Sequence, residues 1–335
     1  MSERTVNILF TSAGRRVELL RWFAQARLDE GIGGKSIATD IDPLAPALQI
    51  ADRTHIVPRL SDPGYIDALT RIVRDEDIDL IVPLIDPDVP VLAEGRSVLE
   101  AAGARVVALP TASVEITMDK WRTYKLLRDL EVPTPRTWIP SDGMGRDHSF
   151  PLVVKPRRGS AGQGVRIVRS QRELDFFLPG VDEPVIQEYL PGPEITTDVF
   201  CGFDGGVLGL VSRERIEVRS GEVSKAVTMV HPEIVEHCLS IAKGLEAEGP
   251  ITVQCILAGT GRPYFTEVNP RFGGGMPLGV AAGMRSPHWL LRLGAGLDVD
   301  APPLGSYQTG LYMTRFDDSF ILTADERGHF AGTDL

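Results

Sequence analysis

The sequence predicts an α/β domain followed by an α+β region, with an open parallel sheet first and a two-part region of strands and hairpins after it. Short apolar runs alternate with amphipathic helical patterns over residues 1–112, which is typical of parallel β/α units. A helical linker follows this part of the chain. From residue 150 onward, strands joined by glycine-containing turns replace the alternation. We therefore expect a parallel sheet beside a second region that is rich in hairpins.

The N-terminal region reads as four buried strands and three helices. In the first helix, Val17, Leu20, Ala24 and Leu28 recur at helical spacing and share one face. The strands are expected at residues 6–11, 36–39, 78–84 and 105–109, and the helices at 17–31, 65–74 and 89–102. This order predicts an open parallel α/β domain over residues 1–112.

A dinucleotide site in this domain is disfavoured. The turn at residues 11–16 carries one glycine, Gly14, where the dinucleotide fingerprint needs three. Ligands of open α/β sheets still collect at the carboxyl ends of the strands. Ser12, Arg15, Asp40 and Asp86 lie at such ends and are candidates for substrate contacts, although turn formation alone is the favoured interpretation.

The linker is expected to be helical over residues 111–130. Trp121, Tyr124 and Leu127 recur there at helical spacing, and Pro133 and Pro135 end the pattern because proline excludes helical geometry before it. We place a domain boundary near residue 112 and a subdomain boundary near 190. The predicted division is 1–112, 113–190 and 191–335.

Composition narrows the class of protein. The net charge of -11 disfavours nucleic-acid binding, whose affinity comes from neutralising phosphates. No apolar run approaches the length that spans a bilayer, and the N-terminus lacks a signal-peptide layout. The three cysteines are scattered without metal-ligand spacing, which fits a reducing cytoplasm. We expect a cytoplasmic enzyme with local basic patches for anionic ligands.

A glycine-rich loop between two strands carries the first chemical signal. Residues 150–156 form an apolar strand that contains Lys155, and residues 157–164 follow with glycines and two arginines. Glycines let backbone N–H groups close over an anion, and no Gly-Lys-Ser/Thr follows as in a Walker loop. We interpret Lys155 with Ser160, Gly162 and Gly164 as a phosphate-binding flap. A flexible exposed hairpin would explain the glycines but not the lysine inside an apolar strand.

A second signal is the run from Phe265 to Arg271. Strand alternation puts Glu267, Asn269 and Arg271 on one face, and the preceding strand at residues 251–257 can bring Gln254 beside them. Carboxylate and amide oxygens suit Mg²⁺, and the guanidinium suits an anion. A half-exposed strand with outward polar residues is the alternative interpretation.

Two further segments are weaker. The strand at residues 185–190 offers backbone groups at Glu188 to Leu190 that could pair with an adenine edge, and Glu194 could accept ribose hydroxyls. Taken alone, it is an ordinary strand end. The glycine run 273–275 follows Arg271, and its bare backbone either approaches a substrate or forms a mobile loop.

Taken together, these segments resemble the ATP-grasp superfamily, especially its carbamoyl-phosphate-synthase-like carboxylate–amine ligases. The resemblance covers residues 113–295, and residues 1–112, including 40–47, look like the accompanying pre-ATP-grasp domain. Each motif is weak alone, but five in the family's order are specific. The matching pieces are Met118-Asp119-Lys120, 154–164, 187–190 with Glu194, Val253-Gln254, and Glu267-Val268-Asn269-Pro270-Arg271.

The resemblance implies a two-subdomain ATP-grasp fold and a role for each matching residue. Gln254 stands where many relatives carry an acidic metal ligand, so one bound metal is better supported than two. The implied roles are ATP phosphates for Lys120 and Lys155, adenine for Glu188, Tyr189 and Leu190, ribose for Glu194, Mg²⁺ for Glu267, Asn269 and Gln254, the γ-phosphate or acceptor carboxylate for Arg271, and a cation near the γ-phosphate for Lys225.

The expected function is therefore ATP-dependent joining of a small carboxylate and an amine, with amino acids among the candidates, through an acyl phosphate. ATP and Mg²⁺ are the expected cofactors, with Mn²⁺ as an alternative metal. A homodimer is the default oligomeric state. The rival interpretations are an ATP-binding phosphotransferase, a regulatory ATP sensor without ligation and, more distantly, an α/β dehydrogenase.

Overall fold

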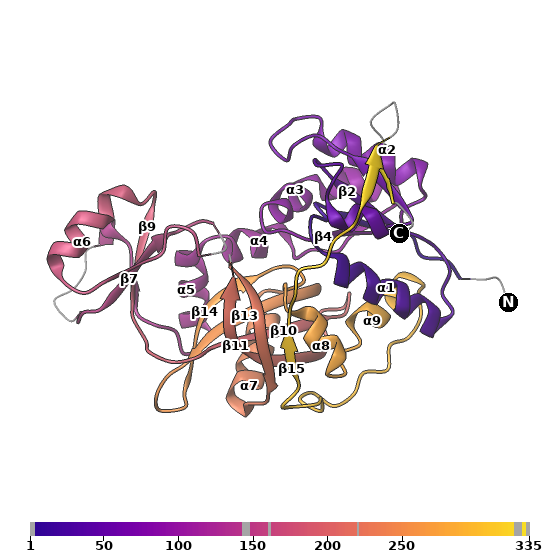
Figure 1. Cartoon of the computed structure of the whole chain (residues 1–335). Helices are drawn as coiled ribbons and strands as arrows, with labels where there is room; N and C mark the ends of the chain where they lie inside the picture. The colour runs from indigo at the N-terminus through magenta and orange to yellow at the C-terminus, as the bar shows by residue number, and fades with distance from the viewer. Residues whose placement is uncertain (1–3, 143–147, 160–161, 220, 325–329, 333–335) are drawn as a thin grey trace.

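The computed structural model describes residues 4–142, 148–159, 162–219, 221–324 and 330–332 (Figure 1). Its first part is a five-stranded parallel sheet of order β3-β2-β1-β4-β5, as the alternating pattern predicts. The strands are β1 (Ile8–Thr11), β2 (Ser36–Asp40), β3 (Arg53–Ile56), β4 (Leu80–Pro83) and β5 (Arg105–Val106). The helices are α1 (Val17–Glu30), α2 (Tyr65–Asp75) and α3 (Asp88–Ala101), with the 3₁₀ turn η1 (Pro46–Ile50).

Two details of this sheet differ from the sequence prediction. The edge strand β3 was not predicted, because its side chains are largely exposed and polar and so give no apolar run. The strand predicted at residues 105–109 is shorter, since only Arg105 and Val106 pair with β4. The sheet order also places a switch point between β1 and β4, because β2 lies on the opposite side of β1.

The linker contains two helices where one helical stretch was predicted. They are α4 (Thr111–Thr117) and α5 (Lys120–Asp129). Asp119 interrupts them in an extended conformation, and its carboxylate accepts hydrogen bonds from the backbone N–H groups of Trp121 and Arg122. This N-cap satisfies donors that the start of α5 leaves free.

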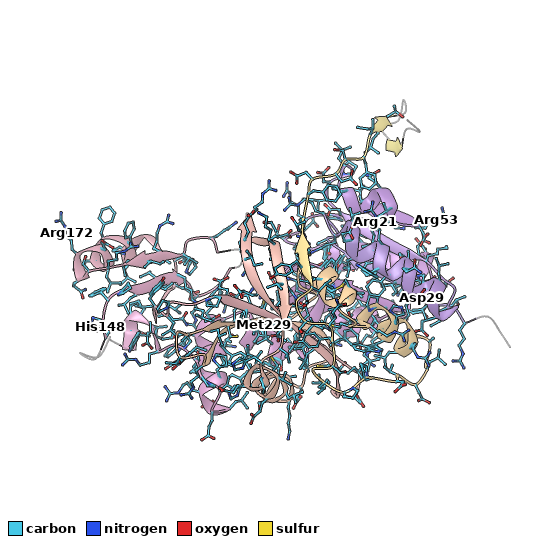
Figure 2. All side chains as sticks on the ribbon, turned by 60° about the horizontal axis from the view of Figure 1, so that its bottom comes forward. Arg21, Asp29, Arg53, His148, Arg172 and Met229 are labelled. Atoms are coloured by element: carbon cyan, nitrogen blue, oxygen red, sulfur yellow. The ribbon has the colours of Figure 1, made fainter. Side chains whose placement is uncertain are left out.

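A four-stranded antiparallel sheet of order β6-β9-β7-β8 follows and stands out from the rest of the molecule as a small lobe (Figure 1). Figure 2 labels Arg172 and His148 on this lobe, at the opposite side of the molecule from Arg21 and Asp29 on α1. Its elements are β6 (Thr137–Trp138), η2 (Pro140–Asp142), β7 (Leu152–Pro156), β8 (Arg166–Val168), α6 (Gln171–Phe177), η3 (Leu178–Gly180) and β9 (Pro184–Glu188). The predicted glycine-rich loop joins β7 to β8.

A six-stranded sheet of order β14-β13-β10-β11-β12-β15 forms the largest part, and all its neighbouring strands are antiparallel. Its strands are β10 (Glu194–Cys201), β11 (Val207–Arg219), β12 (Glu222–Met229), β13 (Gly249–Leu257), β14 (Pro263–Asn269) and β15 (Tyr312–Thr314). Its helices are α7 (Pro232–Gly244), α8 (Met276–Ala281) and α9 (Ser286–Gly294). A short hairpin of β16 (Leu322–Ala324) and β17 (Phe330–Gly332) ends the described chain.

An aromatic cluster joins the first sheet to the six-stranded sheet. Phe23 of α1 lies edge-on to Phe10 of β1 and to Phe272, with ring centroids 4.9 and 6.0 Å apart. Phe272 stacks on Phe200 of β10, which also contacts Trp289 of α9. The same core therefore holds the loop after β1 and the loop after β14 in a fixed relation.

The sheets fall at residues 8–106, 137–188 and 194–314, while the predicted boundaries at 112 and 190 stay predictions. All three cysteines are buried and free. Within the described part of the chain, no helix is long and apolar enough to cross a membrane.

Candidate active site

A cavity of about 780 Å³ lies where the three sheets meet. Its walls come from the first sheet's loops, from the small lobe and from the six-stranded sheet. We call the part near Lys120, Lys155 and Gly162 the lysine end. The arginine end is the part near Arg15, Arg16, Asp86, Glu222 and Arg271, with Arg315 beside it. The residues of the sequence-predicted site that line the cavity are Lys120, Lys155, Gly162, Glu188, Tyr189, Leu190, Glu194, Gln254, Glu267, Asn269 and Arg271.

Lys155 is a buried cation held by neutral groups. It is 8% exposed, and its Nζ donates to Gln187 Oε1 at 2.9 Å. Gln187 Nε2 in turn donates to Thr137 Oγ1, which fixes the amide's orientation. The pKa of Lys155 is lowered to about 8, mainly by burial and to a smaller extent by the nearby Lys120, although Glu267 and Glu194 raise it. A charge so poorly compensated favours an anionic ligand.

A buried ion pair ties the glycine-rich loop to the start of α5. Asp119 is fully buried, and Arg157 Nη2 lies 2.6 Å from its Oδ2. The Arg157 carbonyl accepts from the Lys120 N–H, and Lys120 Nζ donates to the Gly159 carbonyl at 2.7 Å. Lys120 is therefore tied to Arg157 and Gly159 at the start of the loop.

Gln254, Glu267 and Asn269 meet on neighbouring strands, as the hairpin prediction requires. Gln254 of β13 pairs directly with Glu267 of β14, and Asn269 pairs with Thr252. Among the described residues, none of the three side chains has a hydrogen-bonding partner, and all three line the cavity. One carboxylate and two amide oxygens facing open space fit a hard divalent cation such as Mg²⁺, whose remaining positions phosphate oxygens or water would complete.

No metal site made of side chains alone is present in the described ranges, because no group of three His, Cys, Asp or Glu residues gathers there. We call Gln254, Glu267 and Asn269 the platform. It contains a single acid, so an anionic ligand would have to complete the coordination of a bound metal ion. The charge of Glu267 raises the pKa of Lys155, so the lysine end and the platform are adjacent. Cation, lysine and loop would then surround one polyphosphate.

Arg271 joins the six-stranded sheet to the first domain. Its Nη2 donates to Asp86 Oδ2 at 2.6 Å across 185 residues of sequence, and both side chains are largely buried. Asp86 follows β4 at the switch point of the first sheet. Arg271 Nε and Asp86 Oδ1 are buried and have no partner among the described residues. This ion pair therefore leaves two buried polar atoms without a hydrogen bond, although its two residues line the cavity.

Glu222 sits among guanidiniums on the far side of Arg271. Its Oε2 lies 3.1 Å from Arg315 Nη1 and 3.9 Å from Arg15 Nη2. Burial raises the pKa of Glu222, but Arg16, Arg315 and Arg15 lower it by more, and the pKa falls below its ordinary value. Glu222 therefore stays ionised and links β12, the first domain and the C-terminal segment.

The glycine run after Arg271 packs against arginines. A Cβ on Gly275 would lie 2.3 Å from Arg213 Nε, and one on Gly274 would lie 3.1 Å from Arg16 Nη1. Arg213 is itself buried in a bidentate pair with Asp198. Glycine is thus required for close packing of these guanidiniums as much as for any approach of a substrate.

Two of the predicted nucleotide contacts, Glu188 and Glu194, already have partners within the protein. The Glu188 N–H donates to the Arg136 carbonyl, so it is not available to a ligand, whereas Leu190 and Glu194 remain on the cavity wall. Glu194 pairs with Arg215 at 3.0 Å. Gly164 does not line the cavity and packs against Pro156.

Ser160 lies outside the described residues. Lys225 is absent from the cavity wall and pairs with Glu217 at 2.7 Å on the surface of β12, so the geometry gives its predicted catalytic role no support.

Of the first domain's candidates, Arg15 and Asp86 line the cavity, and Asp40 acts as a turn former. Its carboxylate accepts from the Gly14 and Asp42 N–H groups.

Sequence reasoning missed Arg16, Gln187 and the Asp119–Arg157 pair as contributors. An N-cap signal at Asp119 was readable before the helical run, but the partners of Arg16 and Gln187 were not.

Two family models match the chain. The one described as "PylC-like, N-terminal domain" matches residues 8–107, and the one described as "ATP-grasp domain" matches residues 117–275. The carbamoyl-phosphate synthase of Methanobrevibacter smithii is 28% identical over 183 residues, which cover 52% of this chain. The chain spans about half of that relative, since the match covers 47% of it.

Solved structures share the fold at lower identity. The biotin carboxylase domain of the Hydrogenobacter thermophilus 2-oxoglutarate carboxylase, a dimer in complex with MgADP and bicarbonate, has a TM-score of 0.72 and 19% identity, over 91% of this chain and 73% of that one. An L-amino acid ligase from Bacillus licheniformis has a TM-score of 0.68 and 21% identity, over 88% of this chain and 75% of that one. The chain therefore shares the fold of these two structures.

Proposed function

We propose that this chain, which belongs to the ATP-grasp superfamily with carbamoyl-phosphate-synthase-like relatives, is an ATP-dependent ligase that joins a carboxylate to an amine. The substrate carboxylate would attack the γ-phosphorus of ATP, giving an acyl phosphate and ADP. An amine nitrogen would then attack the acyl carbon and displace phosphate, losing one proton as the amide forms. ATP and two small molecules are thus the proposed substrates.

One observation carries this proposal. A single cavity is lined by a lysine end, an oxygen-donor platform and an arginine end. The platform adjoins the lysine end through Glu267, which interacts with Lys155, and it adjoins the arginine end through Asn269, two residues before Arg271. Such an order suits a phosphate chain at one end and a carboxylate at the other, with the reacting γ-phosphate between them. The model described as "ATP-grasp domain" matches residues 117–275, a range that contains Lys120, Lys155, Glu267, Asn269 and Arg271.

The chain's own residues would act mainly by neutralising charge and by positioning. Lys155 and Lys120 would bind phosphate oxygens, so the attack of one anion on another is less opposed. Arg271, fixed by Asp86, would hold the carboxylate near the γ-phosphate. Mg²⁺ on Glu267, Asn269 and Gln254 would offset charge on the phosphates.

Water exclusion is the second requirement, because an acyl phosphate hydrolyses readily. The glycine-rich loop between β7 and β8 borders the cavity through Gly159 and Gly162, both at positive φ. Lys120 anchors that loop through the Gly159 carbonyl. We propose that the loop covers the phosphates during the reaction. Leu190, with its backbone at the cavity wall, is the proposed adenine contact, and Glu194 the ribose contact.

The test is ADP and phosphate release from Mg·ATP in the presence of pooled small carboxylates, pooled amines, or both. We expect release that requires both pools. Release with the carboxylate pool alone, accompanied by a stable acyl phosphate, would instead indicate a phosphotransferase. Binding of ATP with no release under any condition would indicate a sensor. Replacing Mg²⁺ with Mn²⁺ in the same assay tests the alternative metal.

A further inference from the structure

Arg16 is a cation without a carboxylate partner at the arginine end. It follows the turn after β1, lines the cavity, and donates to the Leu84 carbonyl at 3.3 Å. Across the described ranges of the chain, it forms no ion pair. Its neighbours Arg271 and Arg315 are both paired, with Asp86 and Glu222 respectively. A half-buried guanidinium left in this state is costly unless an anion reaches it.

The charges around Arg16 do not cancel. The pKa of Arg16 is lowered to about 10, mainly by desolvation and also by Arg271 and Arg315, while Glu222 and Asp86 raise it. With Arg15, four guanidiniums lie at the arginine end beside only two carboxylates, those of Asp86 and Glu222. The whole chain, in contrast, has a net charge of -11. The local excess is therefore positive, against the sign of the whole molecule.

Arg16 and Arg271 approach the cavity from different parts of the chain. Arg271 follows the metal platform by two residues, while Arg16 comes from the first domain and lies so near Gly274 that a Cβ there would be 3.1 Å from its Nη1. A carboxylate held by Arg271 loses its charge when it becomes an acyl phosphate and then an amide. A second anionic group would keep its charge throughout, so its binding would survive both steps.

We propose that Arg16 forms a subsite for a second anionic group of the substrate, so that the preferred substrate carries two anionic groups, with carboxylates as the first class to test. This inference rests on the proposed function and names its substrate class. The helix α1 begins at the next residue without a side-chain cap, and its free N–H groups add positive potential at the same place.

The experiment compares matched anions by calorimetry at constant ionic strength, with Mg·ADP present. Malonate, succinate and glutarate are titrated against acetate, propionate and butyrate, using the wild type, Arg16→Gln and Arg21→Gln. Arg21 is the matched control, because it lies on the exposed surface of α1, where it pairs with Glu18 (Figure 2). Circular dichroism confirms that each variant folds.

We expect at least one dicarboxylate to bind wild type and Arg21→Gln about tenfold or more tighter than its monocarboxylate match, since hydrogen bonds to charged groups contribute this much. Arg16→Gln should lose that preference but keep its affinity for monocarboxylates. Arg16→Lys, which keeps the charge without the planar fork, should lose only part of it.

Equal binding of mono- and dicarboxylates by the wild type overturns the inference, as does an undiminished preference in Arg16→Gln. Binding of Mg·ADP distinguishes a failure of the proposed subsite from a failure of the proposed function. If Mg·ADP binds and the preference is absent, only the subsite is wrong. If Mg·ADP does not bind at all, the proposed function itself fails.

Discussion

The two ends of the cavity hold most of their cations in opposite ways, and Arg16 is the exception at the arginine end. At the lysine end, Lys155 contacts the amide oxygen of Gln187, and Lys120 contacts the carbonyl oxygen of Gly159. At the arginine end, Arg271 contacts the carboxylate of Asp86. A cation held by neutral dipoles keeps its full charge for an incoming polyanion, whereas a paired cation is held in place but partly neutralised.

This difference suggests a division of labour. In the proposed function the lysine end would attract the phosphate chain, and its parts lie close in the sequence or within one small sheet. The arginine end fixes geometry across the first domain, β12 and the C-terminal segment. Substitutions at the lysine end should therefore affect nucleotide binding and turnover, and those at the arginine end should also affect the stability of the whole fold.

The largest effect is expected for Glu267→Gln, which removes the platform's only carboxylate among the described residues. Turnover should fall by about 10²–10³-fold, the usual cost of losing a central electrostatic contact in the transition state. ADP release measures it, and thermal unfolding should change little because Glu267 has no partner within the described chain. Glu236→Gln on the exposed face of α7 is the control. Wild-type turnover in Glu267→Gln would remove the metal assignment.

Lys155→Met should raise the KM for Mg·ATP roughly ten- to a hundredfold, the loss of a hydrogen bond to a charged group. Because the variant also removes a buried charge, its Tm should stay equal to that of the wild type or rise. Steady-state kinetics and thermal unfolding on the same sample separate the two effects. A lowered Tm with an unchanged KM would reverse the role we assign to the lysine end.

Asp86→Asn tests the arginine end. It leaves Arg271 buried without a carboxylate, so we expect the free energy of unfolding to fall by about 3 kcal/mol. Denaturant unfolding measures it. Glu248→Gln is the matched control, because the Arg105–Glu248 pair also joins the first domain to the region of β13 but is more exposed. That control should cost about 1 kcal/mol or less, and equal losses in both variants would contradict the distinction.

Gly275→Ala probes how tightly the arginines pack. The added Cβ would meet Arg213, which Asp198 holds in place, so the stability should fall by about 1–3 kcal/mol. Gly259→Ala, where a Cβ meets nothing within 4 Å, should be close to neutral. If both variants unfold alike, the glycine run is not required by the guanidiniums.

The smallest effect is the pH dependence of nucleotide binding. Because the pKa of Lys155 is about 8, the lysine loses its charge above that pH, and the KM for Mg·ATP should rise by up to about tenfold by pH 9. Lys155→Met should show no such rise. The effect of Lys155 on the free energy of unfolding has the opposite sign. Between pH 8 and 10.5 the unfolded chain keeps the proton on Lys155 while the folded chain loses it, so the free energy of unfolding rises with pH.

The sequence predicted more of the lysine end than of the arginine end. Lys155 in an apolar strand, the glycine-rich loop and the alternating run to Arg271 are local patterns, and the hairpin register that pairs Gln254 with Glu267 follows from adjacent strands. The break at Asp119 and the exposed strand β3 were missed, because one is a capping geometry and the other has no apolar face. Lys225 was assigned by position in a motif and forms a surface ion pair.

What the sequence determined by itself is the parallel first sheet, the hairpin-rich second region and the candidates for phosphate binding that line the cavity, because periodicity and turn chemistry are encoded within a few residues. What only the tertiary structure decided is the arginine end. Asp86 and Arg271 are 185 residues apart, and Arg16 meets Gly274 only after α1 packs beside the six-stranded sheet through Phe23 and Phe272. Ion pairs of this kind have no sequence period, so packing of the apolar core alone decides which charges are paired and which is left for a ligand.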